Sequence, residues 1–519
     1  MSASAAVSRR LLLTGAFGVA TAGVLAKLPG PALVAGGAGG FAGGPTTTTT
    51  TLPPGPPPVL AGATAATLGP DHVFDLVVAG GRVLDPETRY DAVLDVGIDG
   101  GTVTAIGEGL RGRRTIVAEG RLVAPGFVDL LSYEPDPYGV AFKIADGVTS
   151  NFGMHGINAE ASAFFSAYRN LPPLVNYGGA FDHAWARARL GLEPHRPASA
   201  DQRLELQRMA ERGLADGWVG VHLELEYTPG ADAQEVRAMA EVARDAGVAC
   251  YFHGRFSDNT PPGTNADTLA EIVGVAREVG VGVHVEHITS TGGTFTMPES
   301  LATLQSARTQ GLDVTACMYP YDFWATYLGS ARFDDGWQER FGLDYDDLVV
   351  PGTGERLSRG TFARHRESNT LVAAMGSIPE ADLRAALASD LVMIGSDAIL
   401  ELDGNNHPRA AGTFARVLRY VRDEQAVDGM LALAKMSLFP AQRLTPACPA
   451  MARKGRLQIG ADADLVVIDP ERVEDKATVP EPAQPSVGME WVLVAGRIVK
   501  DPEVVHTGPG AGVGLTRST

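Results

Sequence analysis

Residues 248–287 read VACYFHGRFSDNTPPGTNADTLAEIVGVAREVGVGVHVEH, and this stretch decides the fold class. Two short apolar runs, Val248–His253 and Val281–His287, flank Thr268–Val279, where apolar residues recur at the spacing of a helix. A strand, a helix and a second strand in this order are typical of a βαβ unit with parallel strands. Both runs end in histidine, although a parallel strand buried on both faces favours Val, Ile and Leu.

The same pattern recurs through the middle of the chain. Strand-like apolar runs, most of them followed by a helical stretch, lie at Gly126–Leu131, Val148–Phe152, Leu174–Tyr177, Trp218–Leu225, Val248–His253, Val281–His287, Leu312–Met318 and Leu391–Ser396. Such a series predicts an α/β fold, a (β/α)8 TIM-type barrel over residues 125–450. Aromatic residues crowd the stretch after the seventh run, which predicts an insertion near residues 320–370 that acts as a lid or is simply buried.

Short β-branched runs separated by Gly and Asp turns flank the barrel on both sides. They predict antiparallel strands over residues 73–124 and again over residues 451–505. We expect the two clusters to form one small β-sandwich, and residues 506–519 to form a tail.

The first 72 residues predict an export signal and a spacer. Arg9-Arg10 precede an apolar Ala/Gly-rich run, which is typical of a twin-arginine signal over residues 1–44. An uncleaved anchor is the alternative, but prolines interrupt the run before the ~20 residues that a membrane span needs. Residues 45–72 are rich in Thr and Pro and predict a solvated linker. We therefore expect a protein folded before export to the periplasm or the extracellular space, without a stable membrane anchor after cleavage.

Composition excludes several classes of protein. The chain has 519 residues, of which 45% are hydrophobic and 20% charged, so it can bury a sizeable core. Its formal net charge of −18 argues against a nucleic-acid partner. The 3 cysteines are too few for a disulfide framework, and a homodimer is compatible with this composition.

Candidate metal ligands stand at or just beyond several strand ends. His155 follows the second run, His253 ends the fifth, His287 ends the sixth, and Asp397 closes the eighth. Because the carboxyl ends of barrel strands converge, these side chains suit one divalent ion, with imidazoles favouring zinc and a position left open for water. Taken singly, each histidine is better explained as a hydrogen-bonded core or loop residue. Taken together, their matched placement at strand ends favours a metal site.

The chain beyond the linker resembles the amidohydrolase superfamily, and within it the D-aminoacylase branch. The resemblance rests on the shared order of Asp75–Pro86, Ala124–Asp129, Asp146–Ser150, Leu225–Gly230, Tyr319–Tyr321, Ser396–Asp397, His407–Leu418 and Gly455–Val466. It implies that His253 and His287 are metal ligands and that Asp397 is the catalytic aspartate. His155 falls where this branch has a cysteine ligand, and imidazole can replace thiolate on zinc.

Two departures from the family pattern stand out. Superfamily members carry His-x-His after the strand-one aspartate, whereas Leu131 and Tyr133 occupy those positions here. Three histidine ligands therefore remain, enough for a single ion. The lysine that the branch places two residues after the strand-six histidine, where it helps to hold the substrate carboxylate, is Thr289.

The resemblance implies hydrolysis of a C–N bond in a small-molecule amide such as an N-acyl amino acid. The metal would activate a water, and Asp397 would take its proton and return it to the leaving nitrogen. Arg409 is a candidate for binding the substrate carboxylate or carbonyl, Tyr319 for donating to the oxyanion, and His183 for reaching the pocket. Arg409 in an ion pair and Tyr319 as a barrel cap are the structural alternatives.

Other interpretations stay open at this point. The same ligands would serve a cyclic-amide or dipeptide hydrolase, and a non-catalytic exported binding protein would keep the barrel for its shape alone. Glu224 and Glu226, near the end of the fourth run, are interpreted as solvated loop acids, with a role at the metal as the alternative. His222 and His284 lie inside strands and are assigned to packing or to hydrogen bonds behind the ligands.

Overall fold

The computed structural model describes residues 55–63, 68–69, 71–261, 263–402, 406–506, 508 and 510–518. The export signal predicted for residues 1–44 and most of the predicted linker lie outside the described residues. In the described part of the chain, no helix is both long and apolar enough to cross a membrane.

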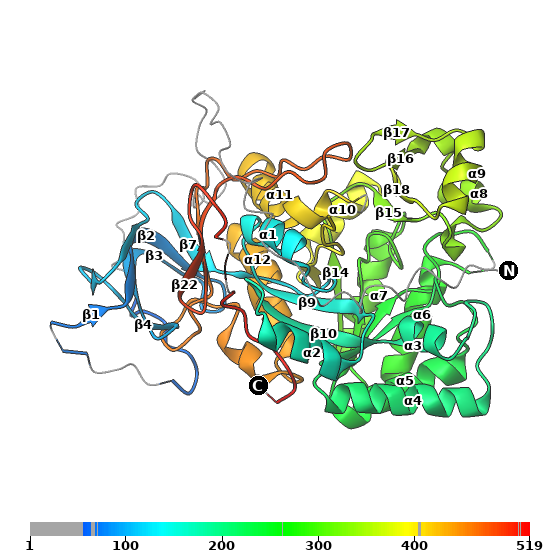
Figure 1. The fold of residues 1–519 in the computed structure, drawn as a ribbon, viewed down its shortest axis with the longest axis horizontal. Coiled ribbons are helices and arrows are strands. Elements are labelled where there is room, and N and C mark those ends of the chain that lie inside the picture. Colours follow the sequence, from blue (N-terminus) through cyan, green and yellow to red (C-terminus); the bar gives the residue numbers. More distant parts are fainter. Residues whose placement is uncertain are drawn as a thin grey trace.

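Eight parallel strands form the barrel, each hydrogen-bonded to the next (Figure 1). They are β8 (Phe127–Asp129), β9 (Val148–Ile157), β10 (Asn176–Asp182), β11 (Gly220–Glu224), β12 (Ala249–His253), β13 (Val283–Val285), β14 (Val314–Met318) and β19 (Val392–Ile394). The segments that follow β8 and β19, the first and last strands, are joined by a hydrogen bond in which the Asp397 amide donates to the Leu131 carbonyl at 2.7 Å. The predicted barrel is confirmed, and each predicted run overlaps one of these strands.

Helices connect the strands and surround the barrel (Figure 1). They are α1 (Pro137–Ala145), α2 (Ala161–Asn170), α3 (His183–Arg189), α4 (Ala200–Ala215), α5 (Ala233–Ala246), α6 (Asn265–Val279), α7 (Met297–Thr309), α10 (Glu380–Ala388), α11 (Arg409–Glu424), α12 (Gly429–Leu433) and α13 (Phe439–Leu444). In α6 a capping box of Thr264 and Asp267 starts the helix, and left-handed Gly280 ends it. Leu269 and Ile272 lie on its buried face.

Strands from the two ends of the chain share one eight-stranded sheet. It comprises β2 (Leu76–Asp85), β3 (Tyr90–Asp99), β4 (Thr102–Gly107), β6 (Thr115–Val117), β7 (Leu122–Pro125), β20 (Leu465–Ile468), β21 (Met489–Val494) and β22 (Arg497–Lys500). The antiparallel pair β7–β20 joins the two halves, and Figure 1 shows the blue and red strands side by side. A two-stranded sheet of β1 (Val73–Phe74) and β5 (Arg111–Gly112) accompanies it.

Between β14 and α10 the chain forms an inserted subdomain, residues 324–374, with its own four-stranded antiparallel sheet. Its elements are β15 (Trp324–Tyr327), the 3-10 helix η1 (Ala331–Phe333), α8 (Trp337–Phe341), β16 (Leu348–Val350), β17 (Glu355–Arg356), α9 (Arg359–Glu367) and β18 (Leu371–Ala374). Buried aromatic side chains, Trp324, Phe333, Trp337 and Phe341 among them, form a core separate from that of the barrel. The insertion predicted near residues 320–370 falls in this subdomain.

The last described residues lie against the barrel rather than free of it. The Tyr177 amide of β10 donates to the Val513 carbonyl at 3.0 Å, and the Leu515 amide donates to the Tyr177 carbonyl at 2.7 Å. Arg517 donates to the carbonyls of Leu214 and Ala246, at the ends of α4 and α5. The C-terminal segment 510–518 therefore spans the side of the barrel opposite the candidate ligands.

Candidate metal-binding active site

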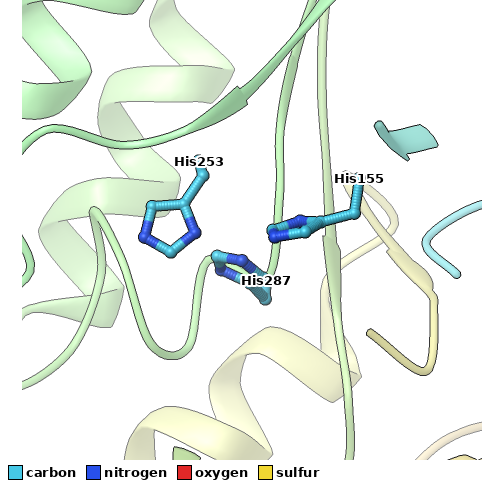
Figure 2. Close-up of side chains that lie close together, drawn as sticks. All are labelled: His155, His253 and His287. Carbon is cyan, nitrogen blue, oxygen red and sulfur yellow. The ribbon is translucent and has the colours of Figure 1, made fainter. Parts of the chain in front are cut away.

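The three predicted histidine ligands meet at the carboxyl ends of the barrel strands (Figure 2). His155 lies in β9, His253 ends β12, and His287 follows β13 with a φ of 27°. One ring nitrogen from each lies within 4.8 Å of the others, and all three side chains are buried. This spacing brings the three imidazoles close enough to share one ion.

Hydrogen bonds orient two of these imidazoles. His253 Nε2 lies 2.8 Å from Glu226 Oε2, while its buried Nδ1 has no hydrogen-bond partner among the described residues. His287 Nδ1 lies 3.1 Å from the Ser290 hydroxyl and 3.3 Å from that of Thr291. Partners of this kind are what metal-bound histidines carry on the nitrogen that does not bind. A buried nitrogen without a partner is costly unless a ligand occupies it, so this donor set fits a metal ion.

His155 lies between two carboxylates. Its Nδ1 is 3.0 Å from Glu286 Oε2, and its Nε2 is 3.0 Å from Glu224 Oε1. His222 Nε2 contacts the same Glu286 oxygen at 3.1 Å. Burial opposes the charged imidazole, yet Glu286, with Asp397, raises the pKa of His155 well above its ordinary value. To bind a metal, His155 must release its proton and exchange one carboxylate for the ion.

Glu226 and Glu286 are buried, and Glu224 is half-buried. Because Glu224 contacts His155 and Glu226 contacts His253, the interpretation of Glu224 and Glu226 as solvated loop acids is wrong. Glu224 is the last residue of β11 and Glu226 lies in the turn that follows, so both stand at the strand end that faces the site. Glu286 was not among the predicted site residues, although an acid directly before a strand-end histidine is a usable signal. His222 contacts Glu286 and His284 contacts the Thr315 hydroxyl, as their interior strand positions predict.

Asp397 follows β19 in a left-handed conformation, with a φ of 52°. Its Oδ2 lies 2.9 Å from Arg409 Nη2, and the Tyr133 hydroxyl donates to its Oδ1 at 3.4 Å. Burial tends to raise the pKa of Asp397, but the Arg409 guanidinium and then His287 hold it below the ordinary value. The carboxylate is therefore ionised at neutral pH and able to accept a proton.

A buried ion pair fixes the loop that carries Asp397. Lys143 Nζ lies 2.6 Å from Asp129 Oδ2, and the Ser396 amide donates to Asp129 Oδ1 at 3.0 Å. The strand-one aspartate thus holds the residue next to Asp397. Both oxygens of the Asp129 carboxylate are therefore in contact, one with the Lys143 ammonium and the other with the Ser396 amide.

Comparison with known proteins places the chain in a family. Residues 191–500 match a family described as "Amidohydrolase family". The chain belongs to this amidohydrolase family. The N-acyl-D-glutamate deacylase of Alcaligenes xylosoxydans xylosoxydans is 30% identical over 462 residues, which covers 81% of this chain and 93% of that protein. The D-aminoacylase of the same organism is 28% identical over 489 residues, covering 86% and 98%.

A solved structure agrees with this placement. The crystal structure of N-acyl-D-glutamate deacylase from Bordetella bronchiseptica, complexed with zinc and a phosphonate inhibitor that mimics the tetrahedral intermediate, has a TM-score of 0.76. It is 27% identical and covers 86% of this chain and 100% of that chain. The protein is therefore a metal-dependent amidohydrolase of the D-aminoacylase branch, acting on C–N bonds other than ordinary peptide bonds. These relatives favour the enzyme over a non-catalytic binding protein.

Arg409, Tyr319 and Thr289 each carry a donor that no described residue accepts. The Arg409 guanidinium stacks over the Tyr319 ring, with Cζ 4.4 Å from the centroid. Arg409 Nη1, the Tyr319 hydroxyl and the Thr289 hydroxyl are buried and have no hydrogen-bond partner in the part of the chain that the structure describes. The alternative of an ion pair holds for Arg409, which contacts Asp397. The alternative of a barrel cap agrees with Tyr319, which is fully buried.

His183 lies apart from this cluster, which corrects the prediction that it reaches the pocket. Its Nε2 is 2.7 Å from Glu235 Oε1 on α5, and Arg187 contacts the same oxygen. All three side chains are buried between helices. Because His183 begins α3 rather than ending β10, its side chain joins the helical layer, where it takes part in a structural ion cluster.

Proposed function

We propose that this amidohydrolase is a zinc-dependent deacylase that hydrolyses the amide bond of N-acyl amino acids. One zinc ion is held by His155, His253 and His287, and Asp397 is the general base. The observation that carries the proposal is the convergence of these four residues, with Arg409 beside Asp397, at one end of the barrel. Three imidazole ligands are the donor set of known catalytic zinc sites.

A single ion is favoured by the residues around Asp397. Leu131 and Tyr133 occupy the positions of the superfamily's His-x-His pair after the strand-one aspartate, and neither supplies a strong zinc ligand. The Asp397 carboxylate is already in contact with Arg409 and Tyr133. When bound, zinc supplies Lewis acidity that polarises the substrate carbonyl and lowers the pKa of a bound water.

Proton transfer falls to Asp397. Ionised and buried, its carboxylate accepts a proton from the attacking water and returns it to the leaving nitrogen. The unpartnered donors Arg409 Nη1 and the Tyr319 hydroxyl suit the carboxylate or the carbonyl oxygen of an acyl amino acid. Thr289 adds a neutral hydroxyl, so Arg409 is the principal cation for the substrate's α-carboxylate.

Metal analysis tests the site directly. We expect purified protein to contain one zinc per chain, and His253→Ala to lose both zinc and activity. Asp397→Asn keeps the three histidines, so it should retain zinc and lose turnover. A protein that takes up no zinc after supplementation would contradict the proposal, and a His253→Ala variant with normal activity would contradict the ligand assignment.

Substrate class needs a separate screen. The relatives named above act on N-acyl-D-glutamate and D-amino-acid derivatives, and we propose the same class for this chain. The screen compares N-acyl-D-amino acids and their L enantiomers with hydantoins, lactams and β-aspartyl dipeptides. Turnover of the D-acyl compounds alone supports the deacylase, whereas preference for hydantoins or lactams identifies the cyclic-amide hydrolase.

We also propose that the protein is exported in a folded state, on the basis of Arg9-Arg10 and the apolar run that follows. Replacing both arginines by lysine should leave the protein in the cytoplasmic fraction. Cell fractionation followed by immunoblotting measures this. Unchanged export of the double variant would contradict a twin-arginine signal.

A further inference from the structure

One arginine of the inserted subdomain lies behind two of the three histidines. Arg332 belongs to η1, and its side chain is only 2% exposed. Its Nε lies 3.4 Å from Glu226 Oε1, and Glu226 Oε2 in turn contacts His253 Nε2 at 2.8 Å. Arg332 therefore reaches His253 through a single carboxylate.

The same guanidinium reaches the surroundings of His287. Arg332 Nη2 donates to the Ser290 carbonyl at 2.7 Å. The Ser290 hydroxyl lies 3.1 Å from His287 Nδ1 and 3.2 Å from the His287 carbonyl. The planar guanidinium thus directs Nε toward the Glu226 carboxylate as an ion pair and Nη2 onto the Ser290 carbonyl.

The inserted subdomain holds this guanidinium in place. Arg332 Cζ lies 4.2 Å from the centroid of the Trp324 ring and 5.2 Å from that of Phe341. Both rings belong to the aromatic core of the subdomain. Cation–π contacts of this kind are stronger when desolvated, so the packed core fixes where Arg332 points.

We propose that Arg332 is a positioning residue, through which the inserted subdomain sets the orientation of His253 and His287 toward a bound metal ion. The inference rests on the metal site of the proposed function and extends it. The subdomain then contributes to metal affinity and is more than a cover. Because coupling is reciprocal, metal binding should in turn order the subdomain.

Zinc affinity, measured by competition with a chromogenic chelator, tests the proposal. Arg332→Met keeps the packing between the two rings and removes the charge. We expect a zinc dissociation constant about 10–100-fold higher, the loss typical of partners behind metal ligands. Glu226→Gln should give a similar loss. The double variant should bind zinc no more weakly than the weaker-binding single variant, because both substitutions interrupt the same chain of contacts to His253.

Arg366→Met is the matched control. Arg366 is a partly buried arginine of the same subdomain that contacts the Phe333 carbonyl and Asp334. It should bind zinc like the wild type. Hydrogen exchange adds a second readout, because zinc should slow exchange over residues 324–341 in the wild type and not in Arg332→Met.

The outcomes separate cleanly. Wild-type zinc affinity in both Arg332→Met and Glu226→Gln would overturn the proposal. If Arg332→Met does not fold, wild-type affinity in Glu226→Gln alone overturns it. A raised KM for anionic substrates with unchanged zinc affinity would make Arg332 a substrate contact and also overturn it. A wild-type chain that binds no zinc would overturn the proposed function, and this inference with it.

Discussion

At the scale of the residue, carboxylates decide what the imidazoles can do. Glu226 contacts one ring nitrogen of His253. Glu286 contacts Nδ1 of His155, and Glu224 contacts its Nε2. An imidazole in the position of a family cysteine needs such a partner, because it carries a proton on one nitrogen when the other binds metal. The His-for-Cys replacement at His155 therefore comes with a buried acid beside it.

Replacing Glu286 by glutamine tests that role. The amide keeps the size of the side chain and removes the charge that holds His155 and His222. We expect zinc to bind about 10–100-fold more weakly in Glu286→Gln, as for other partners of metal-bound histidine. Glu235→Gln, at a buried His–Glu pair in which Glu235 contacts His183 and Arg187 rather than the three candidate ligands, is the control. Equal zinc affinity in Glu286→Gln and the wild type would contradict the assignment.

Arg409 should set the acid limb of the pH profile. Its guanidinium is the principal group that lowers the pKa of Asp397, so Arg409→Met should raise that pKa. The base is then protonated at higher pH, and the acid limb of log kcat/KM moves to higher pH. Tyr319→Phe keeps the cation and should leave the limb in place. If the acid limb of Arg409→Met stays at the pH of the wild type, the group that titrates on that limb is not Asp397.

At the scale of the element, the C-terminal segment 510–518 acts as a strap across the barrel. Two of its glycines lie so close to the chain between α2 and β10 that no side chain fits. An added Cβ at Gly510 would meet the Pro173 carbonyl oxygen at 1.8 Å, and one at Gly512 the Val175 carbonyl oxygen at 1.8 Å. Glycine is therefore required here for close approach rather than for a turn.

Gly512→Ala should dislodge this strap. Overpacking of this kind costs about 1–3 kcal/mol, so the free energy of unfolding should fall by that amount. Gly508→Ala is the control, because nothing lies within 4 Å of an added Cβ there. Urea denaturation of the two variants measures the difference. Equal stabilities would mean that the segment is not bound in solution.

At the scale of the whole molecule, the shared sheet closes the chain around the barrel. Val466 of β20 pairs with Ala124 of β7, and β8 follows directly from β7. One sheet therefore joins the chain segment that enters the barrel to the segment that leaves it. The inserted subdomain lies at the other side of the molecule (Figure 1). Ligand binding at the barrel mouth should accordingly stabilise the entire unit.

Metal removal tests this linkage. A ligand that binds only the folded state at 100 times its dissociation constant adds about 2.7 kcal/mol to the free energy of unfolding. Zinc should therefore raise the melting temperature of the wild type, and a chelator should reverse the rise. His253→Ala should melt at the same temperature with and without zinc. A zinc-induced rise in that variant would indicate binding elsewhere.

The sequence by itself determined the barrel and the convergence of its candidate metal ligands. Strand and helix periods are local properties, and residues at the ends of parallel strands meet in a barrel whatever the details of packing. His155, His253, His287 and Asp397 were predictable for that reason. The shared terminal sheet was also predictable, because its strands carry the same local signals.

Only the tertiary structure decided which groups hold those ligands. Glu286 meets His155 across 131 positions of sequence, and Arg332 reaches Glu226 from an inserted subdomain. His183, placed near a strand end by sequence, instead pairs with Glu235 in the helical layer. Such contacts depend on strand register and on how helices pack between distant segments, and neither is encoded in any local pattern of residues.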